Sequence, residues 1–488
     1  MVSPVRKRST ATALLWTRFA ARAARALFAA LLAACAQPGA ESATPSAPRR
    51  VADAIYLGGD VLTMEGDVPE YAEALAVRDG RIILVGSRSD AQPMQGPATR
   101  VVDLNGRLLL PGFIDDRGDL FATAFRASVA NVAPPPDGTA SSVTAVTRAL
   151  YAWSKTDPAK RLGWIVGAGL DETQLRERRV PTADELDEVS RSEPVVALHR
   201  GGRSAALNGR ARELLHLSGK GSGKGLVSGA AFAVLLAAMP DFDPFEQIDK
   251  AQAIYASLGF TAAQETAASR GRLAALAAAA DTGKLYVDVH SYADVSSDAL
   301  DVVSSRYRTG SYRNHYRIAG WTLALDGAAD PAFDAKVDQA LARGEQLWVR
   351  CGDAAALDAF TSALRKAGAE HAAADRRPVA ALGFAARDEQ LAPLRALGGI
   401  ALPDAPVSLV EAMRVTSRTP TYATLRALTL DAARASFQEE DRGSLRVGKR
   451  ADLVILEENP LGSPAKLARL EVVETVKDGR SIYQRPPR

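Results

Sequence analysis

Residues 110–119 read Leu-Pro-Gly-Phe-Ile-Asp-Asp-Arg-Gly-Asp, an apolar run that ends directly in charged residues. Similar apolar runs with polar ends recur through the middle of the chain, for example PVVALH, LYVDVH and QLWVRCGD. Ala/Leu-rich stretches of helical length separate these runs, and strands that alternate with helices indicate a parallel sheet with crossover helices. Polar residues at strand ends are typical of an α/β barrel whose site lies at the carboxyl ends of its strands.

The two ends of the globular part have a different pattern. Residues 51–109 and 431–488 contain short alternating strands that are broken by turn pairs, and such pairs are typical of β-hairpins. The pairs are Asp79-Gly80, Asn105-Gly106 and Asp478-Gly479. We therefore expect one small β-domain built from both segments, with the barrel formed by residues 110–430.

The first 50 residues have the features of a secretory signal peptide followed by a flexible tether. Residues 1–34 begin with basic residues and contain no acid, and they end in an apolar run that is too short for the roughly 20 apolar residues of a membrane span. The run ends in Leu-Ala-Ala-Cys35, which resembles a bacterial lipobox, so Cys35 is the expected lipidation site. An ordinary signal peptide with a chance cysteine is the alternative. Residues 35–50 are rich in Pro, Ser and Ala and are expected to be a flexible tether.

These features predict a location in the bacterial cell envelope. We expect the protein to be lipid-anchored on the periplasmic face of the outer membrane, with the lipid as its only contact with the membrane. The 488 residues carry 60 basic and 57 acidic side chains, a formal charge of +3. Such a balance gives no overall electrostatic reason to bind nucleic acid, so no nucleic-acid partner is expected. Two cysteines exclude a disulfide framework, and only five histidines are available as metal ligands.

Several short motifs, taken in their order along the chain, resemble the amidohydrolase superfamily. The resemblance is strongest to the amidohydrolase-3 branch, which includes exoenzyme regulators and N-substituted formamide deformylases. The motifs are LPGFID at 110–115, GWIVG at 163–167, LDG at 325–327, LTLDAARASF at 428–437 and GSLRVGKRADLVIL at 443–456. The resemblance implies a (β/α)8 TIM-type barrel with a small β-sandwich built from both chain ends. It also implies hydrolysis of C–N bonds with a divalent metal, typically zinc.

The sequence departs from the family at the residues that would bind this metal. The family's first strand ends in Pro-Gly-Phe-x-Asp-x-His-x-His, and here Arg117 and Asp119 hold the two histidine positions. Arginine stays protonated and has no lone pair to donate to a metal. The family lysine before the LDG motif aligns with Thr322, and its Asp-Gly-His segment reads Gly-Gly-Arg203. The His-x-x-Gly-Asp motif reads VRCGD, with Arg350 and no histidine.

One family element survives, the aspartate Asp404 in the segment LPDAPV. In the family this aspartate orients and deprotonates the metal-bound water, so Asp404 is the candidate catalytic residue. Without a metal to lower the pKa of water, Asp404 is a weak base, and a strand-end carboxylate paired with arginine is the alternative. A carboxylate-only metal site from Asp119, Asp404 and Glu265 is a further alternative for a hard ion.

The arginines suggest two hypotheses for the barrel mouth. If Arg117, Arg203 and Arg350 converge, they form a cationic cavity suited to a small anionic ligand such as a carboxylate or phosphate. Asp119, and Asp171 after another strand, are then candidate ligand-binding residues. The second hypothesis is an internal salt-bridge network of these arginines with Asp119, Asp353 and Asp404, which only holds the mouth closed.

Two functions remain open from the sequence. The first is a non-catalytic binding or scaffold protein of the envelope, which has lost the metal site and needs no cofactor. The second is a residual hydrolase of amide or formamide bonds, with a relocated metal or with a metal-free mechanism that uses Asp404.

Overall fold

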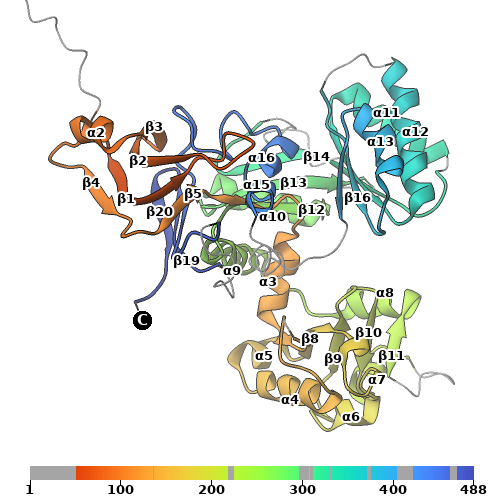
Figure 1. The fold of residues 1–488 in the computed structure, drawn as a ribbon. Helices are drawn as coiled ribbons and strands as arrows, with labels where there is room; N and C mark the ends of the chain where they lie inside the picture. Colours follow the sequence, from red (N-terminus) through yellow and green to blue (C-terminus); the bar gives the residue numbers. More distant parts are fainter. Residues whose placement is uncertain are drawn as a thin grey trace, which may run out of the picture. The chain divides into compact units, whose positions relative to one another are not determined.

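An eight-stranded sheet joins the two ends of the globular part (Figure 1). The strand order is β20-β19-β18-β5-β1-β2-β3, and β4 pairs with β1. The strands are β1 (Ala54–Leu62), β2 (Tyr71–Arg78), β3 (Arg81–Gly86), β4 (Arg100–Asp103), β5 (Leu108–Pro111), β18 (Leu453–Leu456), β19 (Val472–Lys477) and β20 (Arg480–Gln484). The antiparallel pairing of β18 with β5, which sets Leu453 opposite Pro111, brings the two chain ends into one sheet.

The computed structural model describes residues 51–487 apart from 136, 218–224, 296–306, 308–310, 330, 371–374, 404–420 and 462–469. The expected signal peptide, Cys35 and Asp404 therefore lie outside the described residues. Val51–Arg488 forms one unit of the chain. Of the helices that the structure describes, none combines the length and the apolar character needed to cross a membrane.

Two of the three expected hairpins are confirmed, and the third is wrong. Asp79-Gly80 joins β2 to β3 and Asp478-Gly479 joins β19 to β20, with positive φ at both residues of each turn. Asn105-Gly106 also has positive φ, but β4 and β5 on either side of it both run parallel to β1. The parallel pairing with β1 moves from Leu57↔Asp103 in β4 to Asp60↔Leu108 in β5. Residues 58–59 of β1 therefore lie opposite residues 104–107 of the connection between β4 and β5. The Asn-Gly turn absorbs this difference along one edge of β1.

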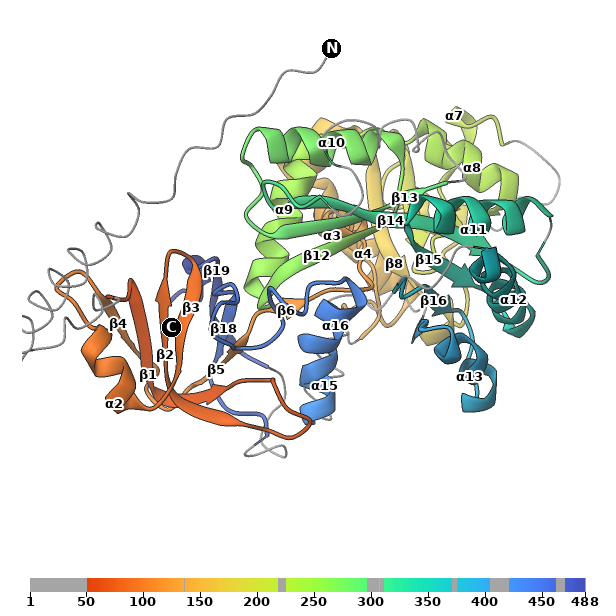
Figure 2. The same ribbon diagram turned by 90° about the horizontal axis from the view of Figure 1, so that it is seen from above.

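The second sheet has seven strands and is parallel throughout (Figure 2). Its order is β17-β16-β15-β14-β13-β12-β6, and every pairing is parallel. The strands are β6 (Phe113–Ile114), β12 (Phe260–Ala268), β13 (Asp288–Asp294), β14 (Tyr316–Leu325), β15 (Gln346–Cys351), β16 (Val379–Leu382) and β17 (Ile400–Pro403). Their helices are α9 (Pro244–Ser257), α10 (Arg270–Asp281), α11 (Pro331–Arg343), α12 (Ala354–Glu370) and α13 (Asp388–Ala396). The fold is mixed α/β, with a parallel half-barrel sheet consistent with a TIM-type barrel.

A separate five-stranded sheet is inserted between β6 and β12. Its order is β11-β10-β9-β8-β7, in which β7, β8 and β9 are parallel. The strands are β7 (Ala130–Asn131), β8 (Ile165–Leu170), β9 (Val195–His199), β10 (Ser204–Leu207) and β11 (Leu226–Ser228). The helices of this part are α3 (Leu120–Ser128), α4 (Val143–Ser154), α5 (Asp157–Leu162), α6 (Ala183–Asp187), α7 (Gly209–Leu214) and α8 (Gly229–Ala238). Strands from GWIVGAG and PVVALH thus belong to this insertion and have apolar cores of their own.

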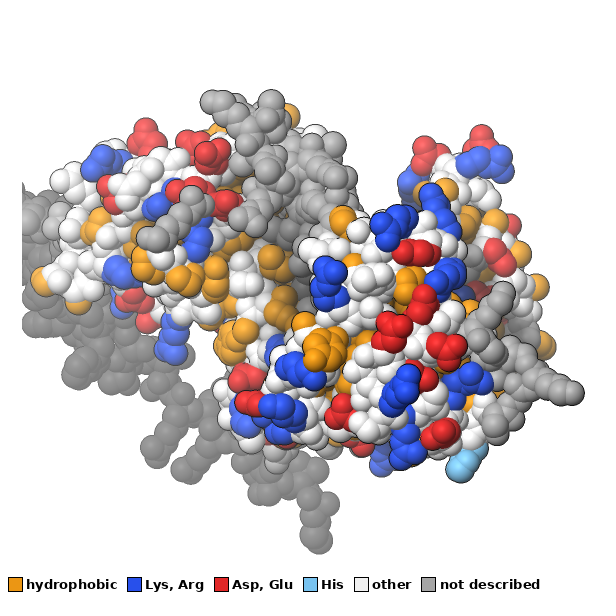
Figure 3. Space-filling view, turned by 90° about the horizontal axis from the view of Figure 1, so that it is seen from below, with side chains coloured by type: hydrophobic (Ala, Val, Ile, Leu, Met, Phe, Trp, Pro, Cys, Tyr) orange, Lys and Arg blue, Asp and Glu red, His pale blue; other side chains and the backbone are white. Residues whose placement is uncertain are grey.

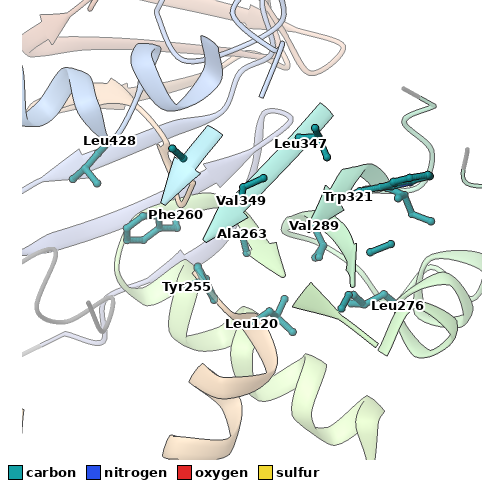
Figure 4. Close-up of a cluster of buried hydrophobic side chains, with 14 of the residues drawn as sticks. Leu120, Tyr255, Phe260, Ala263, Leu276, Val289, Trp321, Leu347, Val349 and Leu428 are labelled. Atoms are coloured by element: carbon teal, nitrogen blue, oxygen red, sulfur yellow. The ribbon is translucent and has the colours of Figure 1, made fainter. Parts of the chain in front are cut away.

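The main core lies between the parallel sheet and its helices (Figure 4). Leu347 and Val349 of β15 join Tyr255 of α9 and Leu276 of α10 in this cluster. Trp348, between them in sequence, belongs to another apolar cluster on the opposite face of the sheet. Alternate residues of a strand point to opposite faces, so both faces of β15 are buried, as parallel sheets require.

Four buried charges join the parallel sheet to the two-ended sheet. Asp288, the first residue of β13, is fully buried and forms ion pairs with Arg442 and with Lys477, whose Nζ lies 3.3 Å from Oδ2. Asp452 lies 3.4 Å from Arg442 and 3.0 Å from Lys477. The side chains of all four are at most 2% exposed. Burial lowers the pKa of Lys477 and of Arg442, and the charges of Asp452 and Asp478 oppose this by favouring the charged forms.

Replacing Asp288 by Asn tests this cluster. The substitution keeps the shape but leaves two buried cations with one fully buried carboxylate, Asp452, and the partly exposed Asp478 beside Lys477. We therefore expect a loss of about 3 kcal/mol in the free energy of unfolding, measured by urea titration. The matched control is Asp388→Asn, which removes an exposed pair with Arg395 at 3.2 Å and is expected to cost less than about 1 kcal/mol. Equal losses in the two variants would contradict the assignment.

Candidate functional site

The turn after β6 carries the residues at the first two metal-ligand positions of the family pattern. Asp115 accepts hydrogen bonds from the Tyr255 hydroxyl at 2.7 Å and from the backbone N–H of Arg117 at 3.2 Å. Arg117, which is half-buried, donates from Nε to the neighbouring Asp116 at 3.2 Å. Burial raises the pKa of Asp116 to about 6, although the charge of Arg117 acts to lower it. The guanidinium of Arg117 is thus bound by a carboxylate of its own turn.

Gly118 fixes the path of this turn. A Cβ at Gly118 would lie 1.7 Å from a carboxylate oxygen of Asp115 and 2.6 Å from the Tyr255 hydroxyl, so only glycine fits. The Thr266 hydroxyl donates to the Gly118 carbonyl at 2.9 Å. These contacts hold the following residue, Asp119, at the start of α3.

Two carboxylates meet one guanidinium at the N-terminus of α3. Asp119 caps the helix by accepting from the N–H of Ala122 at 2.8 Å, and Glu265 of β12 accepts from the N–H of Phe121 at 3.1 Å. Arg272 of α10 places its NH1 atom 2.7 Å from Glu265 Oε1 and 3.6 Å from Asp119 Oδ2. Asp119 and Glu265 also form a β-bridge through their backbones. Carboxylates favour the positive end of a helix, so both are stabilised there.

Burial dominates the electrostatics of this group. The Glu265 side chain is fully buried, which raises the pKa of Glu265 well above its usual value; the charge of Asp119 raises it further, and Arg272 opposes both. Burial acts to lower the pKa of Arg272, but Glu265 and Asp119 outweigh it, so the pKa is raised. Arg272 therefore remains charged and neutralises the carboxylate pair. We call Asp119, Glu265 and Arg272 the mouth bridge.

The residues at these positions do not fit a divalent cation. The oxygens of Asp119 and Glu265 already accept from backbone amides and face Arg272, whose positive charge repels a metal ion. Thr322, at the position of the family lysine, accepts from the N–H of Ala267 at 3.4 Å. Without a metal, nothing in the mouth bridge lowers the pKa of water toward 7, which is the step on which hydrolysis in such sites depends.

The other expected residues are spread over two sheets. Arg203 is exposed in the turn before β10 of the five-stranded sheet. Arg350 lies in β15, which β12, β13 and β14 separate from β6 and Arg117. Asp353 accepts from the N–H of Ala356 at 2.8 Å at the start of α12. The structure thus brings Asp119 to Glu265 and places Arg203 in a different sheet from Arg117.

Asp171 lies after β8, beside Glu172 and His199, and these three carry potential metal-ligand atoms within 4.8 Å of one another. His199 Nδ1 accepts from the N–H of Gly201 at 3.0 Å, so the ring proton is on Nε2, which faces Glu172 at 3.2 Å. In this tautomer neither ring nitrogen offers a free lone pair to a metal.

The Asp171 carboxylate is likewise engaged by protein donors. It accepts from the Thr173 hydroxyl at 2.6 Å, from Gln174 Nε2 at 2.9 Å and from Arg200 NH1 at 3.2 Å. Burial acts to raise the pKa of Asp171, but these hydrogen bonds outweigh it and lower the pKa to about 2. Asp171 therefore holds Arg200 in place. A metal ion at this cluster would have to displace that guanidinium.

Sequence reasoning missed Arg272, although a signal for it was present. Arg270 and Arg272 lie in the first turn of α10, after its cap Ser269, and this turn contains no acid. Cations are unfavourable at a helix N-terminus, so a basic residue there indicates a carboxylate partner from another element. Glu265, at the end of the preceding strand, is that partner.

The mixed α/β fold with its parallel half-barrel sheet is consistent with the α/β barrels of the amidohydrolases. The family described as "Amidohydrolase family" (Amidohydro_3) matches residues 100–409 and 401–483, and the chain belongs to this family. It is 26% identical to the exoenzymes regulatory protein AepA of Pectobacterium carotovorum over 57% of this chain, and 28% identical to the N-substituted formamide deformylase of Arthrobacter pascens over 33% of it. These matches span 64% and 29% of the two relatives' own lengths.

The solved structures that resemble this chain share its fold. An uncharacterised metal-dependent hydrolase from Pyrococcus furiosus superimposes with a TM-score of 0.64 at 18% identity, covering 84% of this chain and 99% of that one. A second, from Pyrococcus horikoshii, gives a TM-score of 0.65 at 18% identity, with 88% and 100% covered.

Removing Arg272 tests the mouth bridge through its pH dependence. Because the pKa of Glu265 is higher in the folded than in the unfolded chain, stability is lost as pH rises from about 4.5 through the folded pKa. Arg272→Met raises that pKa further. We therefore expect Arg272→Met to lower the free energy of unfolding by about 3 kcal/mol at pH 8. This value is near the lower end for a buried ion pair because the Arg272 side chain is 40% exposed. At pH 5, where Glu265 binds a proton, the loss should be smaller.

Urea unfolding at the two pH values measures the difference. The matched control is Arg272→Met in a Glu265→Gln background, where no buried carboxylate remains opposite the guanidinium and the pH-dependent part of the loss should vanish. A loss that is the same at pH 5 and pH 8 in the single variant would contradict the mouth bridge.

Proposed function

We propose that this protein is a non-catalytic member of the amidohydrolase family that acts as a binding or scaffold lipoprotein of the bacterial cell envelope. The mouth bridge is the observation that carries the proposal. By the family pattern Asp119 stands at a metal-ligand position, and its carboxylate instead caps α3 and lies 3.6 Å from Arg272. A guanidinium neutralises the carboxylates as a metal would, but it cannot activate water.

The anchor and the finer architecture belong to the same proposal. The lipobox-like segment before Cys35 supports attachment to the periplasmic face of the outer membrane through a lipid. The half-barrel sheet supports a (β/α)8 barrel, and the two-ended sheet supports the small β-domain as a sandwich. Basic and acidic side chains are interspersed over the face shown in Figure 3, which supports the absence of a nucleic-acid partner.

The relatives support the proposal in part. The relative that matches 57% of this chain is described as a regulatory protein, which suits a role other than turnover. The deformylase relative favours the second candidate, a residual hydrolase of non-peptide C–N bonds. For that candidate a relocated ion at Asp171, Glu172 and His199 is the specific alternative, because their potential ligand atoms lie within 4.8 Å of one another.

Metal analysis of the full-length protein, purified without chelator, separates the two candidates. We expect transition-metal content far below one ion per chain and no hydrolysis of N-substituted formamides, with or without added zinc, because Arg272 repels a cation at the mouth. One zinc or other transition ion per chain, together with formamide turnover that a chelator abolishes, would overturn the proposal. In that event, loss of the ion in His199→Gln would place it at the relocated cluster, and retention would place it at the barrel mouth.

A further inference from the structure

A cavity of about 410 Å³ lies beside the five-stranded sheet, apart from the mouth bridge. Its lining comes from α3, α8 and α9 and from residues at the carboxyl ends of β7, β8 and β9. The strand-end members include Asn131, Gly169 and His199. In open α/β sheets, ligands bind at the carboxyl ends of the parallel strands. The volume is also within the range of small-molecule sites, which runs from about 300 to 1,000 Å³.

One side of the cavity is apolar. Phe125 of α3, Leu198 of β9, Phe232 and Leu236 of α8 and Ile254 of α9 line it. The side chain of Leu236 is 52% exposed, although leucine normally gains about 1.5–3 kcal/mol from full burial. This wall can therefore gain stability by covering an apolar group of a ligand.

Two arginines and one carboxylate, Asp137, also line the cavity. Arg200 lines it and is held in place by the Asp171 carboxylate at 3.2 Å. Arg126, in the last turn of α3, also lines it, and its guanidinium reaches only the Thr123 hydroxyl, at 3.5 Å. Within the described part of the chain, no carboxylate lies within ion-pair distance of Arg126. Arg200 has a partner that fixes its position, while Arg126 carries a positive charge that a ligand can neutralise.

We propose that this cavity binds a small amphiphilic monocarboxylate, an alkyl or aryl carboxylic acid. The carboxylate is recognised by Arg126 and Arg200, because a guanidinium binds a carboxylate through paired, charge-assisted hydrogen bonds. The alkyl or aryl group packs against Phe125, Phe232 and Leu236. The site shares no residue with the mouth bridge, but it shares His199 with the Asp171, Glu172 and His199 cluster of the hydrolase candidate.

Equilibrium dialysis of the full-length protein with 4-phenylbutyrate tests the site. We expect saturable binding, and at least tenfold weaker binding of the neutral amide 4-phenylbutanamide, because the amide keeps the apolar part and loses the charge. Arg126→Gln should weaken phenylbutyrate binding at least tenfold. Arg126 is exposed, so this change leaves the core intact. Leu236→Ser should weaken binding of the acid and the amide alike.

The matched control is Arg148→Gln on α4, an exposed arginine that does not line the cavity. It should bind phenylbutyrate like the unaltered chain. Absence of saturable binding, equal binding of acid and amide, an unchanged affinity in Arg126→Gln, or inorganic phosphate that displaces the acid at equal concentration would each overturn the proposal.

Discussion

The junction between the two large sheets depends on the four buried charges of Asp288, Asp452, Arg442 and Lys477. Each charge is costly to bury alone, and the attraction between the charges offsets that cost only when all are in place. Asp288 belongs to the parallel sheet, whereas Lys477 ends a strand of the two-ended sheet. Lys477 also pairs with Asp452 and Asp478 of its own part of the chain, and Asp288 is the charge that the parallel sheet contributes. The ion pairs of Asp288 with Arg442 and Lys477 tie β13 to the sheet that both ends of the chain build.

At the mouth of the barrel, too, a buried charge needs a counter-charge. Carboxylates at the ends of parallel strands need a counter-charge, and in a metal-dependent hydrolase the ion provides it. Here Arg272 provides it from within the chain, at 2.7 Å from the buried Glu265. Under the proposed function, the fold keeps a counter-charge for these carboxylates in Arg272 but has no Lewis acid to activate water.

Local patterns predicted the local structure, and the order of motifs predicted the family. Asp79-Gly80 and Asp478-Gly479 form the hairpins that their sequence indicates, because the turn itself requires positive φ. Asn105-Gly106 has the same dihedral preference but forms no hairpin. The strands on either side of it, β4 and β5, both pair with β1 in parallel instead of with each other. Turn chemistry is local, whereas strand pairing depends on distant partners.

The candidate site shows the same limit. Arg117 and Asp119 were found because they stand at family positions, but their partners could not be aligned. Arg272 lies on another element, and only the fold brings it to Glu265. The insertion was also hidden, because β8 and β9 alternate with helices just as barrel strands do. The proposed carboxylate-binding cavity is lined by residues of α3, α8 and α9 and by the ends of β7, β8 and β9. Nothing in the sequence spacing of these residues links them.

Helix α3 connects the mouth bridge to the proposed binding cavity. Its N-terminus is fixed by Asp119 and Glu265, and its last turn carries Arg126 into the cavity wall. The cavity lining begins at Ala122, whose N–H is capped by Asp119, so the mouth bridge holds the first turn of the helix that lines the cavity. Under the proposed function, Arg272 takes the place of an ion at the start of α3, while Arg126 in its last turn lines the cavity.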